Sequence, residues 1–205
     1  MQHTLLALSV LVLAALLAWL LWLLPPAPAP TGQAHPALAL AVAPTGGDFR
    51  LDSAAGTLDL AQLRGKVVLI YFGYTWCADI CPTNLAFIAA ALKGLSPAEL
   101  ARVQVLFISV DPARDDPGRL ATYAAYFHPN IRGVTGTPEQ IAAAARRYGA
   151  AYQRVDQPAS AGGYLVDHSA ATYLVDPQGR LMQTLDHATH PDTIAAAIRH
   201  LLGGG

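Results

Sequence analysis

Cysteine, charge and internal methionine are all scarce in this chain of 205 residues. It contains 2 cysteines, 2 methionines, 13 basic and 14 acidic residues, for a formal net charge of −1. Such a neutral balance gives no basic footprint for nucleic acid, so we expect no nucleic-acid partner. Two cysteines are too few for a small disulfide-rich secreted scaffold, so the domain must fold on a hydrophobic core. The two thiols are therefore free for function.

The N-terminal residues do not look globular. Leu5 to Leu24 form an almost unbroken apolar run, interrupted only by Ser9. About 20 residues span a bilayer core, so we predict that residues 1–24 are a transmembrane anchor. The alternative is a long signal peptide that is removed, with a small-x-small site at Ala27–Ala29. No Lys or Arg follows the run before Arg50. The positive-inside rule therefore gives little indication of the orientation, but the absence of positive charge permits translocation of the C-terminal side.

The remaining chain divides into a spacer and a soluble domain. Residues 25–46 begin with a stretch rich in proline and alanine, which predicts an extended linker. Residues 47–205 are long enough for one domain with its own core.

An apolar strand, a helix and a second apolar strand follow one another in this domain. The strands are expected at Val67–Phe72 and Val103–Val110, and the helix at Pro82–Lys93. This order predicts a right-handed βαβ unit with parallel strands. Further elements are expected at residues 49–59 (a short hairpin), Pro117–Phe127 (a helix), Pro138–Tyr148 (a helix), Ala151–Val155 (a strand), Ala171–Leu185 (a hairpin) and Pro191–Leu202 (a helix). The pattern predicts an α/β fold, a thioredoxin-like central sheet flanked by helices.

The two cysteines, Cys77 and Cys81, lie at the turn between the first central strand and its helix. One helical turn separates them, so both sulfurs can face the same point. They could form a structural or redox-active disulfide, or bind a soft metal ion together. A thiol peroxidase, in which the hydroxyl of Thr75 positions the peroxide, is a further alternative that nothing else in the chain supports.

His168 is the best candidate for a third metal ligand, although a lone histidine is more often an ordinary surface residue. We expect it in a loop just before the strand at 172–175, beside the dithiol turn. Two thiolates and one imidazole suit copper, because thiolates favour Cu(I) and imidazole accepts either Cu(I) or Cu(II). Structural zinc normally takes four protein ligands, and no second cysteine pair supplies them. Asp167 could support the site by orienting the loop or a ring nitrogen of His168.

Four sequence blocks resemble the Sco/SenC family of membrane-anchored copper proteins, which help to assemble cytochrome c oxidase. These blocks are Lys66–Pro82, Phe107–Pro117, Gly133–Gly136 and Val166–Pro177. The resemblance implies a thioredoxin-like fold in which Cys77, Cys81 and His168 hold copper. Asp79 matches the family's acidic residue between the cysteines, where its role could be electrostatic. Ala78 departs from the proline that usually follows the first cysteine, which could change the rigidity of the turn and the potential of the dithiol.

The resemblance also implies a function and its partners. The family acts on the binuclear copper centre of cytochrome c oxidase subunit II. We therefore predict a copper chaperone, rather than an enzyme, that delivers copper to that subunit. The alternative is a thiol-disulfide reductase that keeps the cysteines of the subunit reduced, and a copper or redox sensor is a third hypothesis. The chaperone needs an upstream periplasmic copper donor and a thiol reductant. We expect a bacterial inner-membrane anchor that leaves the soluble domain in the periplasm.

Overall fold

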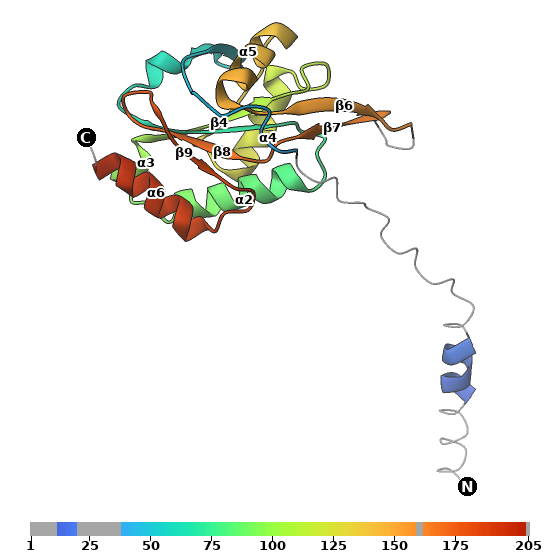
Figure 1. The fold of residues 1–205 in the computed structure, drawn as a ribbon. Coiled ribbons are helices and arrows are strands. Elements are labelled where there is room, and N and C mark those ends of the chain that lie inside the picture. The colour runs from blue at the N-terminus through green and yellow to red at the C-terminus, as the bar shows by residue number, and fades with distance from the viewer. Residues whose placement is uncertain (1–11, 20–37, 159–161, 204–205) are drawn as a thin grey trace. The chain divides into compact units, whose positions relative to one another are not determined.

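The computed structural model describes residues 12–19, 38–158 and 162–203, which belong to two compact units, Met1–Ala34 and His35–Gly205. In the first unit, residues 12–19 are helical and exposed (Figure 1). The rest of the predicted anchor, residues 1–11 and 20–24, lies outside the described residues, as do residues 25–37 of the predicted linker. Among the helices that the structure describes, none combines the length and apolar character needed to cross a bilayer.

A mixed sheet of five strands forms the centre of the second unit, in the order β5-β4-β3-β8-β9. The strands are β3 (Val67–Gly73), β4 (Val103–Ser109), β5 (Ile131–Val134), β8 (Thr172–Val175) and β9 (Leu181–Leu185). β3 pairs in parallel with β4 and antiparallel with β8. All residues of these three strands are buried, as expected for strands covered on both faces. The predicted parallel βαβ unit is confirmed.

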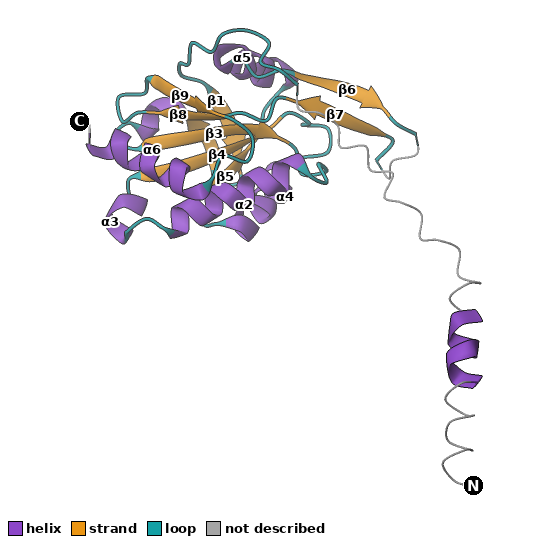
Figure 2. Cartoon of the chain, turned by 60° about the horizontal axis from the view of Figure 1, so that its bottom comes forward, coloured by secondary structure: helices purple, strands orange, loops and turns teal. Residues whose placement is uncertain are grey.

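Helices cover both faces of this sheet (Figures 1 and 2). They are α2 (Ile80–Lys93), α3 (Pro97–Leu100), α4 (Pro117–Phe127), α5 (Pro138–Tyr148) and α6 (Pro191–Gly203). One core cluster joins α2, α4 and α6 to Val67, Leu69 and Tyr71 of β3. The other joins α5 to the alternate β3 residues, Val68 and Ile70 among them. Because successive side chains of β3 point to opposite faces of the sheet, this one strand contributes residues to both core clusters.

Two small hairpins lie outside the central sheet. β1 (Arg50–Ser53) and β2 (Gly56–Asp59) form one, followed by the short 3-10 helix η1 (Leu60–Leu63). β6 (Tyr152–Asp156) and β7 (Tyr164–His168) form the other, a two-stranded sheet of its own. Figure 1 shows this second hairpin extending from one end of the domain.

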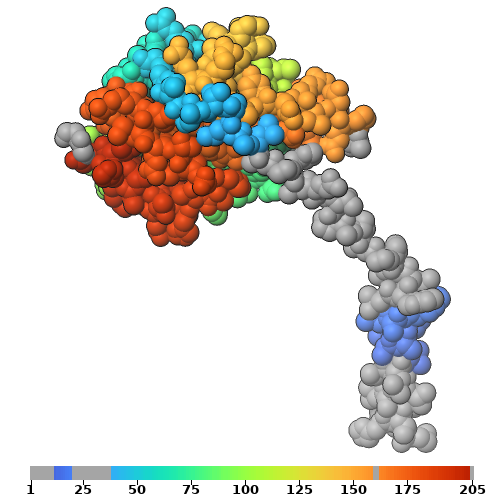
Figure 3. Space-filling model, viewed as in Figure 1, coloured from blue at the N-terminus to red at the C-terminus, as the bar shows by residue number. Residues whose placement is uncertain are grey.

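The segment at residues 38–47 runs along the surface of the domain, as the light-blue atoms of Figure 3 show. The backbone N–H of Leu38 donates to the carbonyl of His168 at 3.0 Å, and that of Ala41 donates to Gly149 at 2.8 Å. Thr45 donates likewise to Arg147 at 2.8 Å. The C-terminal part of the predicted linker is therefore hydrogen-bonded to the domain that follows it.

The α/β class and the helices at Pro117–Phe127 and Pro138–Tyr148 agree with the sequence-based predictions, but two details near the cysteines differ. α2 begins at Ile80 instead of Pro82, so Cys81 lies in its first turn. The expected start was two residues late because the first four backbone N–H groups of a helix have no partner within it, so Pro82 also fits its third position. His168 is also not in a loop: it ends β7 and pairs with Tyr152 of β6.

Candidate metal centre

Cys81 is fully buried in the first turn of α2, directly over the end of β3. Gly73, the last residue of β3, leaves the space that the Cys81 side chain occupies. A Cβ added to Gly73 would lie 2.6 Å from the Cys81 sulfur and 2.8 Å from the ring of Phe107. The absence of a side chain at residue 73 therefore lets the sulfur pack against the sheet.

Cys77 lies in the turn before α2 and is partly exposed. The backbone N–H of Cys81 points at its sulfur, with a nitrogen–sulfur distance of 3.4 Å. A backbone donor in the first turn of a helix stabilises a thiolate over a thiol. Both cysteines are free in the structure, and neither is in a disulfide.

His168 brings its imidazole to the same point from β7 and is 3% exposed. Its Nδ1 lies 3.0 Å from the carbonyl oxygen of Ser169, and its Nε2 lies 3.2 Å from the Cys81 sulfur. A carbonyl can only accept, so the N–H of Nδ1 points at Ser169 and Nε2 faces the cysteines. The rings of Tyr71 and Tyr74 form T-shaped pairs with the imidazole, with centroid distances of 6.2 and 5.9 Å.

The structure thus brings together the three predicted ligands. The sulfurs of Cys77 and Cys81 and a ring nitrogen of His168 lie within 4.8 Å of one another. Across the described ranges, this is the one group of His, Cys, Asp and Glu side chains found to be arranged for a metal ion. Two soft thiolates and a pre-oriented imidazole fit copper. Structural zinc would lack its fourth protein ligand here.

The pKa values of the two thiols are shifted in opposite directions. The hydrogen bond from the Cys81 thiol lowers the pKa of Cys77 to about 4, opposed by burial and assisted by His168. Burial raises the pKa of Cys81, and the neighbouring Cys77 sulfur raises it further. The pair therefore behaves as a partly exposed thiolate that accepts a hydrogen bond from a buried thiol.

The two acidic residues predicted to support the site lie at different depths. Asp79 is exposed at the N-cap position of α2, and its side chain makes no capping hydrogen bond. Asp167 is half-buried and pairs with Gln153 across the hairpin. It precedes His168 in β7, so its side chain points to the opposite face of the strand. The roles of Asp79 and Asp167 stay predictions.

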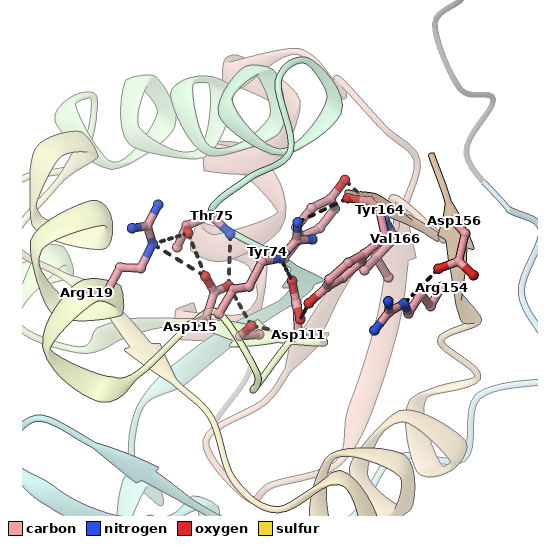
Figure 4. Close-up of polar contacts among 11 residues, drawn as sticks. Tyr74, Thr75, Asp111, Asp115, Arg119, Arg154, Asp156, Tyr164 and Val166 are labelled. Atoms are coloured by element: carbon pink, nitrogen blue, oxygen red, sulfur yellow. Dashed lines mark hydrogen bonds and ion pairs between the residues drawn. The ribbon is translucent and has the colours of Figure 1, made fainter. Parts of the chain in front are cut away.

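A buried carboxylate holds the start of the dithiol turn, which the sequence-based reasoning missed. Asp115, fully buried, accepts hydrogen bonds from the backbone N–H of Thr75 at 2.9 Å and from its hydroxyl at 2.6 Å. Ser109 at the end of β4 donates to the same carboxylate at 2.7 Å. Arg119 donates to the Thr75 hydroxyl at 2.6 Å (Figure 4). The hydroxyl considered for a peroxide site thus has a structural role. The signal in the sequence was an acidic residue in the polar loop that follows a buried strand.

Asn84 provides a second support that was not predicted. It lies one turn after Cys81 in α2 and is 1% exposed. Its amide donates to the hydroxyl of Thr172 at 2.9 Å and accepts from the backbone N–H of Ala188 at 3.2 Å. Asn84 therefore ties the cysteine-bearing helix to β8, which follows His168 in the chain.

Comparison with known proteins identifies the family. The family model SCO1/SenC matches residues 39–203, which is most of the chain. The chain belongs to the SCO1/SenC family. The resemblance expressed by the four sequence blocks is thereby confirmed.

Individual SCO1/SenC relatives agree in sequence and fold. The mitochondrial SCO2 homolog of Mus musculus is 39% identical over 155 residues, covering 75% of this chain and 60% of the relative. A crystal structure of Arabidopsis thaliana ScoI with copper bound is 33% identical, with a TM-score of 0.72 over 78% of this chain and 99% of that one. Apo Sco1 from Thermus thermophilus is 39% identical, with a TM-score of 0.70 over 83% and 100%. The chain spans roughly half to three-fifths of several curated relatives it matches.

Proposed function

We propose that this SCO1/SenC protein carries copper for the assembly of cytochrome c oxidase and delivers it to the binuclear copper centre of subunit II. The observation that carries the proposal is the convergence of two sulfurs and one imidazole nitrogen within 4.8 Å. Family membership and the copper-bound state of the related Arabidopsis protein support it.

The geometry suggests how copper would enter and leave. Cys77 is partly exposed, whereas Cys81 and His168 are buried, so an incoming ligand reaches the Cys77 side first. Transfer would proceed by ligand exchange, as thiolates of the acceptor replace those of Cys77 and Cys81. Oxidation of the two thiols to a disulfide would remove two electrons and both soft ligands. A thiol reductant must then return two electrons before copper can be loaded.

The cellular setting follows from the same proposal. Residues 1–24 would anchor the chain in the bacterial inner membrane, and residues 25–46 would lead to a copper-binding domain at 47–205 in the periplasm. A periplasmic copper donor would load the site. Protease protection of the chain in sealed vesicles, with accessibility only from the periplasmic side, tests this topology.

A thiol-disulfide reductase acting on subunit II is the second candidate, favoured by the unequal thiols. Cys77 combines partial exposure with a pKa lowered to about 4, mainly by the Cys81 hydrogen bond. Cys81 lies beside it as a resolving thiol. This activity needs both cysteines but no imidazole, whereas the copper site uses all three residues.

Copper stoichiometry on the reduced full-length chain separates the two functions. The native protein is expected to retain one Cu(I) against a competing chelator under anaerobic conditions. We expect Cys77→Ser to abolish retention and His168→Ala to weaken binding while leaving disulfide exchange with a partner peptide intact. A native protein that retains no copper but exchanges disulfides rapidly would establish the reductase instead. His200→Ala is the matched control, because His200 is an exposed residue in the last turn of α6 and does not belong to the group of three candidate ligands.

A further inference from the structure

The imidazole of His168 is held by a part of the fold that the central sheet does not include. β6 and β7 pair with each other and form a separate two-stranded sheet. His168 is the last residue of β7, so any shift of this hairpin moves its Nε2 relative to the Cys81 sulfur. The contacts that dock the hairpin against the dithiol turn therefore decide where the third ligand lies.

Arg114, in the loop after β4, makes the most extensive of these contacts. Its side chain is only 13% exposed, and its Nε forms an ion pair with Asp111. Its Nη1 donates to the carbonyl oxygen of Tyr164 in β7 at 3.0 Å. The guanidinium carbon lies 3.6 Å from the centroid of the Tyr164 ring and 5.4 Å from that of Trp76, the neighbour of Cys77. One largely buried cation thus joins β7 to the dithiol turn.

The surroundings of Arg114 fit this role closely. The hydroxyl of Tyr164 donates to Asp111 at 2.8 Å, so the ring is held at both its face and its hydroxyl (Figure 4). A Cβ added to Gly162 would lie 2.5 Å from Nη1 of Arg114. The backbone N–H of Val166 in β7 also donates to the hydroxyl of Tyr74 at 3.3 Å. These contacts lie on the path between the hairpin and the cysteines.

We propose that Arg114 is a positioning residue of the metal centre: by stacking on Tyr164 it docks the β6–β7 hairpin so that His168 faces the two sulfurs. The inference rests on the copper-carrying function proposed above. Cu(I) is held chiefly by the soft thiolates, whereas Cu(II) depends more on the imidazole. Arg114 therefore affects Cu(II) binding more than Cu(I) binding.

Arg154 provides a matched control on the same ring. Its guanidinium carbon lies 3.8 Å from the Tyr164 centroid, but its side chain is 62% exposed. Its ion-pair partner, Asp156, is 78% exposed (Figure 4). Arg154 therefore shares the stacking interaction of Arg114 without its burial or its connection to the dithiol turn.

The test measures Cu(II) affinity and the electron paramagnetic resonance spectrum of the reduced full-length protein loaded anaerobically. Arg114→Ala is expected to weaken Cu(II) binding by about 10- to 100-fold, the usual cost of losing a partner that orients a ligand. Its spectrum should move toward that of His168→Ala. Arg114→Lys should recover only part of the affinity, because the ammonium group of lysine is not planar and cannot stack on the Tyr164 ring as a guanidinium does. Arg154→Ala should stay within about threefold of the native affinity.

Two further readouts separate positioning from a general loss of stability. The double variant of Arg114→Ala and His168→Ala should bind Cu(II) no more weakly than His168→Ala alone, because both changes remove the same contribution. In the copper-free protein, Arg114→Ala should speed amide hydrogen exchange of Val166 while the amides of β3 keep their native rates.

Native Cu(II) affinity and spectrum in a folded Arg114→Ala protein would overturn the inference, and so would additive losses in the double variant. If Arg114→Ala does not fold, Arg114→Lys decides: a native spectrum and affinity in that variant would also overturn it. A native protein whose Cu(II) binding is unchanged by His168→Ala would refute the role of His168 as a ligand, and with it this inference. A native protein that binds no copper at all would overturn the proposed function itself.

Discussion

The dithiol turn and the β6–β7 hairpin meet at the metal centre, but the fold holds them in different ways. The turn follows β3, whose seven residues are all buried between β4 and β8, and the carboxylate of Asp115 fixes its first residues. The hairpin has largely exposed or half-buried residues and pairs only within itself among the strands described. Side chains such as Arg114 and Tyr164 dock it instead.

The two regions therefore differ in the free energy needed to move the candidate ligands that they carry. Local opening is least costly where few apolar contacts are lost, so the hairpin can open at a lower cost than the central strand. Of the candidate ligands, Cys81 is therefore the fixed one and His168 the movable one. Such an arrangement suits the proposed function, because a copper carrier must both hold the metal and release it.

The largest effect is expected in the contrast between Cys77 and Cys81, the two thiols of the dithiol turn. Iodoacetamide should add one label to the reduced, copper-free protein, at Cys77, and leave the fully buried Cys81 unmodified. Because the pKa of Cys77 is lowered to about 4, its thiolate persists as pH falls and is lost only through that value. The rate should therefore be nearly constant from about pH 6 to 8, where an ordinary thiol gains about tenfold per unit. Peptide mapping by mass spectrometry locates the label.

Cys77→Ser is the control for that experiment and should remove nearly all labelling. Equal labelling of both cysteines, or a rate that climbs steadily through neutral pH, would show that the two thiols are not differentiated as the structure indicates.

A smaller but clear effect is expected from Gly73→Ala, which disturbs the fixed region alone. The new methyl group would lie 2.6 Å from the Cys81 sulfur and 2.8 Å from the ring of Phe107, and both of these side chains are fully buried. We expect the free energy of unfolding to fall by about 1–3 kcal/mol, as for other overpacked cores. Urea denaturation of the reduced protein measures it. Gly203→Ala, where the added Cβ meets nothing within 4 Å, should stay within about 0.5 kcal/mol of native. Equal stability of the two variants would contradict the close packing of Cys81 on β3.

The smallest effect is expected in the β6–β7 hairpin, from Tyr74→Phe. This change removes the hydroxyl that accepts from Val166 and keeps the ring beside His168. Loss of one such hydrogen bond costs about 0.5–1.5 kcal/mol. We expect faster hydrogen exchange at the Val166 amide and little change in β3, measured by nuclear magnetic resonance. Tyr126→Phe, at a ring that is 85% exposed, should change neither. Faster exchange throughout β3 would show that the two regions open together.

The central elements could be predicted because their sequence signals are local and strong. β3 and β4 are continuous apolar runs, and α5 begins after Thr137, whose side chain accepts from the backbone N–H of Gln140. β5 and β7 were missed because they are short and carry polar residues such as Arg132 and Asp167. Their strand conformation depends on partners that only the folded chain supplies.

The site was predictable to a similar degree. Spacing alone pointed to Cys77 and Cys81, whereas His168 became a strong candidate only through the family resemblance. The supporting residues Gly73, Arg114 and Asp115 lie inside the recognised sequence blocks, yet no role could be assigned to them. Arg114 contacts a carbonyl 50 residues away, and Thr75, one of the partners of Asp115, is 40 residues away.

The sequence by itself determined the family, the buried strands and the pair of thiols at a strand-to-helix turn, because each is encoded by neighbouring residues. Only the tertiary structure decided that Cys81 is buried and Cys77 partly exposed, that Nε2 of His168 faces them, and that Arg114 joins the hairpin to the turn. These features depend on burial and on contacts between segments that lie 40 to 88 residues apart, as between Asn84 and Thr172. Distances and burial of this kind exist only once the chain has folded.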